Sequence, residues 1–233
     1  MRIEPSSAER WVAAAADLLL GAACAGCGTA WWGLCPDCRR LLEGRTPYAA
    51  APVPCPAEFP RTVTSSPYDP LVRGMINAHK EHQALGLTRL LADRLALSVH
   101  ALLLARGWPG RRPVVLVPVP SAGRVVRQRG FDATLAMTRL AARRLRGRYP
   151  ISVQPALVQR AGVRDQAGLD AQARRANLNG GFRLRSALPR EPVVLTDDLV
   201  TTGSTLAEAV RVLQSAGVTV IGAATVAATE RRK

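Results

Sequence analysis

Two adjacent acids and a run of small hydroxyl residues lie near the C-terminal end of the sequence. Residues 192–206 read Pro-Val-Val-Leu-Thr-Asp-Asp-Leu-Val-Thr-Thr-Gly-Ser-Thr-Leu, an apolar run followed by the acids and by a turn that opens a helix. Asp197 and Asp198 would stand at the carboxyl end of a buried strand, where open α/β sheets bind ligands. Adjacent carboxylates there can accept hydrogen bonds from two vicinal sugar hydroxyls, or hold the water shell of Mg²⁺.

The turn after the two acids has the composition of an anion-binding site. Its residues are Thr201, Thr202, Gly203, Ser204 and Thr205. The glycine lets the backbone come close to a ligand, and the surrounding amides and hydroxyls would point at an anion from a helix N-terminus. A lone Thr-Gly-Ser-Thr would suit an ordinary helix cap equally well. The complete string favours a ribose 5-phosphate held between the acids and the turn.

A second chemical feature is formed by four of the five cysteines. Cys24, Cys27, Cys35 and Cys38 make two Cys-x-x-Cys pairs separated by seven residues. Four thiolates at this spacing can close a tetrahedral Zn²⁺ site, which would be structural because no position is left for a substrate. A redox pair, an iron–sulfur cluster and paired disulfides are the alternatives. Cys55 stands alone in a proline-rich stretch and is expected to be an uninvolved thiol.

The charge of the chain is strongly positive and comes almost entirely from arginine. The formal net charge is +15, from 32 basic and 17 acidic residues, and Lys80 and Lys233 are the only lysines. An excess of guanidinium groups suits a partner rich in phosphate, although a GC-rich genome would produce the same bias. Hydrophobic residues make up 48% of the chain, enough for a sizeable core, while aromatics make up only 4%.

The N-terminal residues raise the question of targeting. Residues 11–23 are mostly apolar, but Asp17 interrupts them and acids accompany the arginines of the leader. An amphipathic helix packed on the rest of the protein is therefore expected in preference to an export signal. No stretch approaches the roughly 20 apolar residues of a membrane span, so we expect no membrane insertion. The Cys-x-x-Cys pairs suit a reducing compartment, which predicts a cytoplasmic protein.

The order of predicted elements indicates an α/β domain preceded by a small module. We expect an apolar helix and cysteine module in residues 1–45, a linker with five prolines in 46–60, and the main domain in 61–233. Strands are predicted at 62–66, 114–117, 156–158, 193–195 and 218–228, and helices at 71–79, 85–104, 133–145 and 205–216. This alternation predicts a mainly parallel sheet with helices on both faces.

Arginines gather after the second predicted strand and in a later polar segment. Arg124, Arg127 and Arg129 follow Pro120 and Ser121 and could bind phosphate oxygens bidentately. Residues 162–181 form a polar stretch without clear periodicity, expected to be a loop that folds over a ligand and excludes water. The arginines of this second group are Arg160, Arg164, Arg174 and Arg175. Each arginine taken singly has a solvated surface charge as its alternative.

With these motifs in place, the chain resembles the ComF family of competence proteins. The string 192–206 resembles the 5-phosphoribosyl-1-pyrophosphate (PRPP) signature of type I phosphoribosyltransferases. Tyr68-Asp69…Lys80, Val117-Pro-Val-Pro120…Arg129-Gly-Phe131 and Arg160…Arg174-Arg175 resemble further family motifs and occur in the family's order. The resemblance implies a type I phosphoribosyltransferase (Rossmann-like) fold with an N-terminal zinc module, and PRPP bound with Mg²⁺.

Residue by residue, the resemblance assigns PRPP contacts to a defined set. The set is Asp197, Asp198, Thr201, Thr202, Gly203, Ser204, Thr205, Pro120, Ser121, Arg124, Arg129, Lys80, Arg160, Arg174 and Arg175. The two acids are its catalytic candidates. Purine phosphoribosyltransferases generally carry a base-contacting Asp just before the Thr-Gly, and Thr201 at that position makes purine salvage a less expected role.

Three functions from different classes follow. The resemblance to ComF implies a PRPP-binding protein that handles single-stranded DNA in natural transformation, together with proteins of the competence machinery. The second is an active phosphoribosyltransferase with an unknown acceptor, in which Mg²⁺ and arginines stabilise the departing pyrophosphate. The third is a PRPP-responsive regulator or adaptor without turnover, with the zinc module contacting other proteins.

Overall fold

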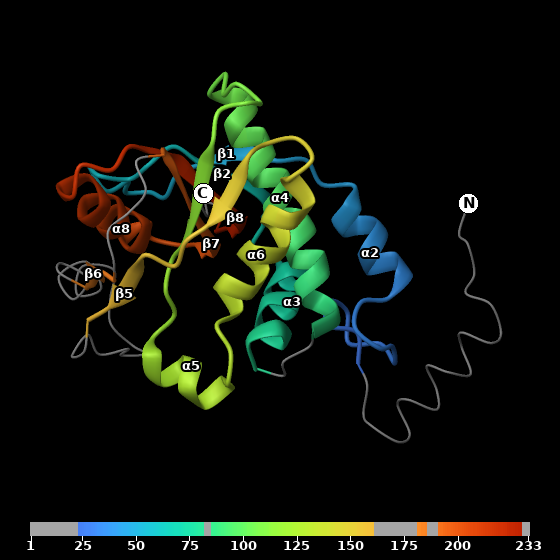
Figure 1. The fold of residues 1–233 in the computed structure, drawn as a ribbon. Helices are drawn as coiled ribbons and strands as arrows, with labels where there is room; N and C mark the ends of the chain where they lie inside the picture. The colour runs from blue at the N-terminus through green and yellow to red at the C-terminus, as the bar shows by residue number, and fades with distance from the viewer. Residues whose placement is uncertain (1–22, 82–84, 161–180, 186–190, 230–233) are drawn as a thin grey trace.

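The fold is built on one six-stranded sheet with helices on both faces (Figure 1). The computed structural model describes residues 23–81, 85–160, 181–185 and 191–229. The expected N-terminal helix, and almost all of the arginine-rich stretch 162–181 with Arg164, Arg174 and Arg175, lie outside these ranges. Within them, no helix combines the length and the apolar content needed to cross a bilayer.

The strand order of the sheet is β1-β2-β8-β7-β3-β4. The strands are β1 (Tyr48–Ala50), β2 (Thr62–Pro67), β3 (Val114–Pro118), β4 (Ile151–Val153), β7 (Val193–Val200) and β8 (Val220–Ala228). All neighbouring pairs are parallel except β1, which runs antiparallel to β2 at the edge. The central strands are nearly continuous apolar runs because helices bury both of their faces.

The core consists of two apolar clusters, one on each face of the sheet, and helices cover both. The helices are α2 (Pro36–Glu43), α3 (Pro70–Glu81), α4 (Leu85–Ala105), α5 (Gly123–Arg129), α6 (Ala133–Leu145) and α8 (Ser204–Ser215). One face is covered by α3, α4 and α6, together with the buried cysteines of the N-terminal module. The other face is covered by α8 and by the hairpin of β5 (Leu157–Gln159) and β6 (Phe182–Leu184).

The fold predicted from the sequence is confirmed: an α/β domain with a mostly parallel sheet and an N-terminal four-cysteine cluster. Some details differ from the prediction: α2, α5, β1, β4 and β6 were not predicted, and two of the expected strands are changed. The strand expected at 193–195 extends to Val200, because β8 continues to pair with it to Val200↔Ala228 after pairing with β3 ends at Pro118↔Thr196. The short strand expected at 156–158 is β5, which pairs with β6 in a separate antiparallel hairpin.

The proline-rich segment 46–60 contributes to the main domain. Its first part is β1, which pairs with β2 through Tyr48↔Thr64 and Ala50↔Thr62. Its later part places the buried Pro52 and the half-buried Phe59 against the start of α8. The segment therefore packs along the sheet edge and against the turn that carries the predicted phosphate site.

Candidate functional site

The two acids lie in the carboxyl-terminal half of β7, where the strand is paired with β8 alone. Asp198 is 7% exposed, and its Oδ2 forms an ion pair of 2.5 Å with Nζ of Lys80, from the last turn of α3. Oδ1 of Asp197 accepts a hydrogen bond of 2.8 Å from the backbone amide of Asp198. Thr196 directly precedes the acids on β7. Its hydroxyl group is 2.9 Å from that of Thr138, and this hydrogen bond joins β7 to α6.

Asp197, Asp198 and Lys80 form an interacting trio, and their surroundings shift the pKa values of Asp197 and Lys80. Burial raises the pKa of Asp197 well above its ordinary value, and the neighbouring charge of Asp198 raises it further. Burial lowers the pKa of Lys80, but the attraction of Asp198 and Asp197 outweighs it, so the net shift is upward. Lys80 is therefore a cation paired with Asp198. Asp197 is the acid that would gain most from an arriving cation or hydrogen-bond donor.

The turn between β7 and α8 has the backbone geometry of an anion site. Gly203 precedes the helix with φ of 75°, a left-handed conformation that glycine adopts without strain. The first amides of α8 have no partner within the helix, which makes them available to an anion. The hydroxyl groups of Thr202 and Ser204 are 3.2 Å apart.

The side of Gly203 on which a side chain would lie is closed by the proline-rich segment. A Cβ atom at Gly203 would lie 2.7 Å from Cγ of Pro52 and 2.7 Å from Cδ2 of Phe59. A ligand must therefore approach the turn from the other side. The sequence analysis did not assign Phe59 to the site, although an aromatic residue between prolines is a signal of local packing.

This packing predicts that Gly203→Ala destabilises the protein more than Gly217→Ala. Both glycines have positive φ, but the space beside Gly217 is open. We expect Gly217→Ala to lower the free energy of unfolding by about 1–2 kcal/mol from backbone strain. Gly203→Ala should lower it by a further ~1–3 kcal/mol from overpacking against Pro52 and Phe59. Urea unfolding of both variants measures the difference, and equal losses would show that the contact is not restrictive.

The loop after β3 lies next to the acids. The backbone amide of Val119 donates to the carbonyl of Thr196 at 2.8 Å, which fixes the loop beside β7. Pro120 and Ser121 are half-buried and line a cavity of about 300 Å³. The walls of the cavity are mostly apolar and come from the loop, α5, the start of α6 and the β5–β6 hairpin; its polar members include Asp132, Gln159 and Arg185.

The predicted arginines are placed differently from one another. Arg129, at the end of α5, is half-buried, and its charge acts on both Lys80 and His79. Arg124 is exposed on the same helix. Arg160 is exposed at the end of the β5–β6 hairpin where the connecting segment begins, and its backbone amide donates to the carbonyl of Gly181 at 2.8 Å. The structure thus brings Arg129 near the acid–lysine trio and leaves Arg160 on the surface.

The histidine next to Lys80 has a packing role. His79 is buried, with Nδ1 3.3 Å from the hydroxyl of Thr88 and its ring edge-on to Phe131 at 5.6 Å. Burial lowers its pKa. A neutral, packed imidazole fixes the end of α3 against α4 and the residues before α6.

The four paired cysteines converge in space, as the spacing predicted. Their sulfur atoms all lie within 4.8 Å of one another. Cys24, Cys35 and Cys38 are buried, and Cys27 lies at the surface. The amides of Gly26 and Cys35 point at the sulfur of Cys24, at 3.4 and 3.3 Å. Donation from backbone amides is the kind of surrounding interaction that orients metal-binding ligands.

Three of these thiols have shifted pKa values. The hydroxyl and backbone of Thr29 lower the pKa of Cys27 to about 6, whereas burial raises the pKa of Cys35 and Cys38. Buried thiolates need a compensating positive charge, and the four sulfurs together can bind a zinc ion. Cys55 lies apart and is exposed.

Comparison with known proteins agrees with the arrangement of β3, β7 and their loops. Residues 106–233, more than half of the chain, match the phosphoribosyl transferase domain. The chain belongs to this family. Among its relatives, the DNA utilization protein YhgH of Escherichia coli K12 is 28% identical over 197 residues, covering 78% of this chain and 84% of the relative. YhgH of Salmonella typhimurium is 29% identical over 201 residues with the same coverage.

The relatives extend the likeness beyond the matched domain, since they cover more of the chain than residues 106–233. With its N-terminal four-cysteine cluster, the chain is a ComF-like protein with a phosphoribosyltransferase domain. The resemblance described from the sequence is confirmed at this level.

Proposed function

We propose that the chain binds PRPP together with Mg²⁺ at Asp197, Asp198 and the turn that follows them. The observation that carries the proposal is the arrangement around Asp198. A carboxylate pair lies in the carboxyl-terminal half of β7, and one member holds Lys80 at 2.5 Å. A short turn then leads from the strand to a helix N-terminus with a left-handed glycine. One short segment thus contains carboxylates that can accept hydrogen bonds from sugar hydroxyls, followed by backbone amides that can donate to a phosphate.

Each residue has a defined task in this proposal. The carboxylates of Asp197 and Asp198 accept hydrogen bonds from the ribose hydroxyls, and the backbone amides of 202–205 bind the 5-phosphate. Lys80 and Arg129 place positive charge beside the pyrophosphate. Hard carboxylate oxygens suit Mg²⁺, which when bound would neutralise charge on the pyrophosphate oxygens.

The biological setting that we propose is the handling of single-stranded DNA in the cytoplasm. It is supported by the relatives, which are called DNA utilization proteins, and by the excess of 32 basic over 17 acidic residues. Arg124 and Arg127 are exposed on α5, beside the loop that lines the site. These two arginines can bind DNA phosphates next to a bound phosphosugar. The process that we propose is natural transformation, in which the protein would act together with competence proteins.

A second candidate function is transfer of ribose 5-phosphate from PRPP to an acceptor. The cavity of about 300 Å³ supports it, because the loop at Pro118–Ser121 lines the cavity and also contacts β7 just before the acids. Its volume and mostly apolar walls suit a small organic molecule. Release of pyrophosphate in the presence of one acceptor, and no release in the absence of that acceptor, would establish turnover.

We also propose that the four-cysteine cluster holds one structural Zn²⁺. A closed set of four thiolates leaves no position for substrate, and three of the four cysteines are buried. The metal would replace the hydrophobic core that so short a module cannot build for itself.

A thermal-shift comparison tests the phosphosugar proposal. We expect PRPP with Mg²⁺ to raise the melting temperature more than ribose 5-phosphate does, because a ligand of the native state stabilises it by mass action. The increase should diminish when Mg²⁺ is omitted. A 5′-phosphorylated single-stranded oligonucleotide serves as the third ligand. A shift with the oligonucleotide and none with PRPP at a saturating concentration would contradict the proposed site.

A further inference from the structure

The four-cysteine module packs directly against α3, the helix that carries Lys80. A Cβ atom at Gly74 of α3 would lie 1.9 Å from the carbonyl oxygen of Ala25. A Cβ atom at Gly26 would lie 2.3 Å from Cδ1 of Leu71, on the same helix. The first Cys-x-x-Cys turn and the first half of α3 therefore touch closely, backbone against backbone at Gly74 and through the side chain of Leu71 at Gly26.

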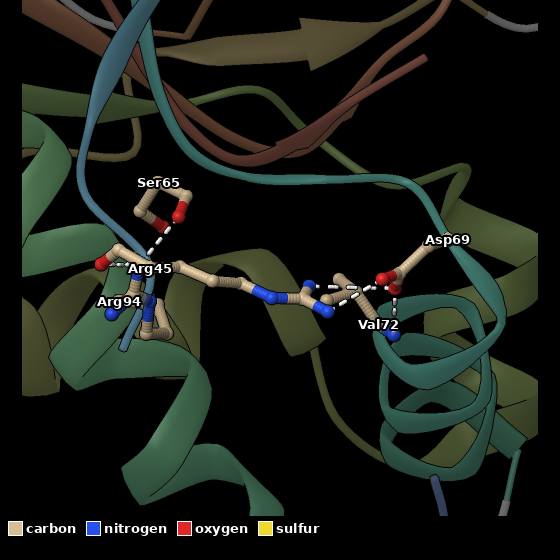
Figure 2. Close-up of polar contacts among 5 residues, drawn as sticks. All are labelled: Arg45, Ser65, Asp69, Val72 and Arg94. Atoms are coloured by element: carbon tan, nitrogen blue, oxygen red, sulfur yellow. Dashed lines mark hydrogen bonds and ion pairs between the residues drawn. The ribbon is translucent and has the colours of Figure 1, made fainter. Parts of the chain in front are cut away.

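A second contact joins the end of the module to the start of α3 (Figure 2). The guanidinium of Arg45, just after α2, donates to both carboxylate oxygens of Asp69, at 2.5 and 3.4 Å. Oδ1 of Asp69 in turn accepts from the backbone amide of Val72 at 3.0 Å and so caps α3. The ion pair and the helix cap share one carboxylate.

The backbone at Arg45 is itself held to the sheet. The guanidinium of the buried Arg94, from α4, donates to the carbonyl of Arg45 at 2.9 Å and also to the carbonyl of Ser65 in β2. Arg45 is thus fixed relative to β2 and α4 while it holds the beginning of α3. The end of the module therefore connects the start of α3 to the sheet.

α3 transmits this placement to the candidate site. It is a continuous helix from Pro70 to Glu81, with the module contacts in its first half and Lys80 in its last turn. Gly74 and Lys80 are about 9 Å apart along the axis, from the rise of an α-helix. Over so short a length a helix moves as a rigid body. The ion pair with Asp198 therefore depends on where the module seats α3.

We propose that the four-cysteine module is a positioning element of the phosphosugar site, setting α3 so that Lys80 reaches Asp198. Arg45 and Asp69 act as positioning residues, because they touch α3 and lie at the opposite end of the helix from the ion pair. The inference rests on the proposed function for its consequence, which is PRPP affinity. Its structural premise, the position of Lys80, can be measured without ligand.

Gly74→Ala is the sharpest test, with Gly86→Ala in α4 as its control. The added methyl at Gly74 must push α3 away from Ala25, whereas Gly86 faces open space. Both changes replace a helical glycine by alanine, so the intrinsic effect on helix formation is favourable in each. Any difference between the two variants then reports the contact with the module.

Lys80 and Lys233 are the only lysines, so acylation of the full-length protein gives a clean readout by peptide mass spectrometry. In Gly74→Ala we expect Lys80 to be modified faster relative to Lys233, because it loses the contact with Asp198. We expect PRPP affinity in calorimetry with Mg²⁺ to fall about tenfold, a usual size for coupling between sites. Gly86→Ala should leave both quantities unchanged. In a Lys80→Ala background, Gly74→Ala should cost little further affinity.

Asp69→Asn provides the same comparison should Gly74→Ala fail to fold. Asparagine retains the helix cap but loses the ion pair with Arg45, and Asp93→Asn removes a surface pair with Arg144 as its control. An unchanged Lys80 modification rate in the folded variants would overturn the inference. If wild-type protein does not bind PRPP at all, the proposed function fails, while the modification rates still decide whether the module positions Lys80.

Discussion

The double variant Asp197→Asn/Asp198→Asn is expected to lose measurable PRPP binding while remaining folded. Both carboxylates are the proposed acceptors for the ribose hydroxyls, and both contribute the negative charge that Mg²⁺ requires. Asparagine keeps nearly the same shape, so the pairing of β7 with β8 should persist. Calorimetry with PRPP and Mg²⁺ measures the affinity, and circular dichroism checks the fold. An unchanged affinity would contradict the site.

The single variants should separate binding from stability. Because burial and Asp198 raise the pKa of Asp197, its charged form is disfavoured in the folded state, and Asp197→Asn should preserve or increase the free energy of unfolding. Asp198→Asn leaves Lys80 without its partner. The resulting loss in the free energy of unfolding should lie between the ~1 kcal/mol of an exposed ion pair and the ~3–5 kcal/mol of a buried one.

The raised pKa of Asp197 also gives a pH dependence. A ligand that is held by the ionised carboxylate of Asp197 binds more tightly as the pH rises and this carboxyl group loses its proton. Wild-type affinity should therefore increase with pH over the range in which Asp197 titrates, and Asp197→Asn should abolish this component. Asp37→Asn, at an exposed position of α2, is the matched control and should bind as the wild type does.

The second large effect is expected from the metal. We predict one tightly held zinc per chain, lost in Cys38→Ser because this buried sulfur is one of four that converge within 4.8 Å. Structural zinc sites bind with apparent free energies of about 10–16 kcal/mol, so its loss should unfold the module. Metal analysis by mass spectrometry and the melting temperature measure the two consequences. Cys55→Ser, at an exposed and separate thiol, should change neither.

The alternatives for the cluster give different results in the same experiment. An iron–sulfur cluster would appear as iron and visible absorption, and paired disulfides would leave no free thiols among the four cysteines. Purification with thiol protection that yields neither zinc nor another metal would refute the proposed site. Because the module packs on α3, zinc loss should also increase the modification rate of Lys80.

Much of the fold was predictable because its signals are local. The apolar runs at 114–117 and 193–195 and the helical periodicity at 133–145 each depend on neighbouring residues. The two acids, the Thr-Thr-Gly-Ser-Thr turn and the Cys-x-x-Cys pairs were found for the same reason. Ligand-binding turns and metal knuckles are short, so one stretch of chain contains most of their chemistry.

The remaining features depend on segments that meet only in the folded chain. The resemblance placed Lys80 and Asp198 in one set of ligand contacts, but no local signal indicated their ion pair. No local signal indicated that Arg45 contacts Asp69 or the buried Arg94 either. Strand order sets which side chains face each other, and helix packing on the sheet sets which helix ends reach the acids. Local sequence patterns thus predict a phosphosugar turn and a four-cysteine metal site. Only folding places the cysteine module against the helix whose lysine holds Asp198, because close packing in a shared core brings distant residues into contact.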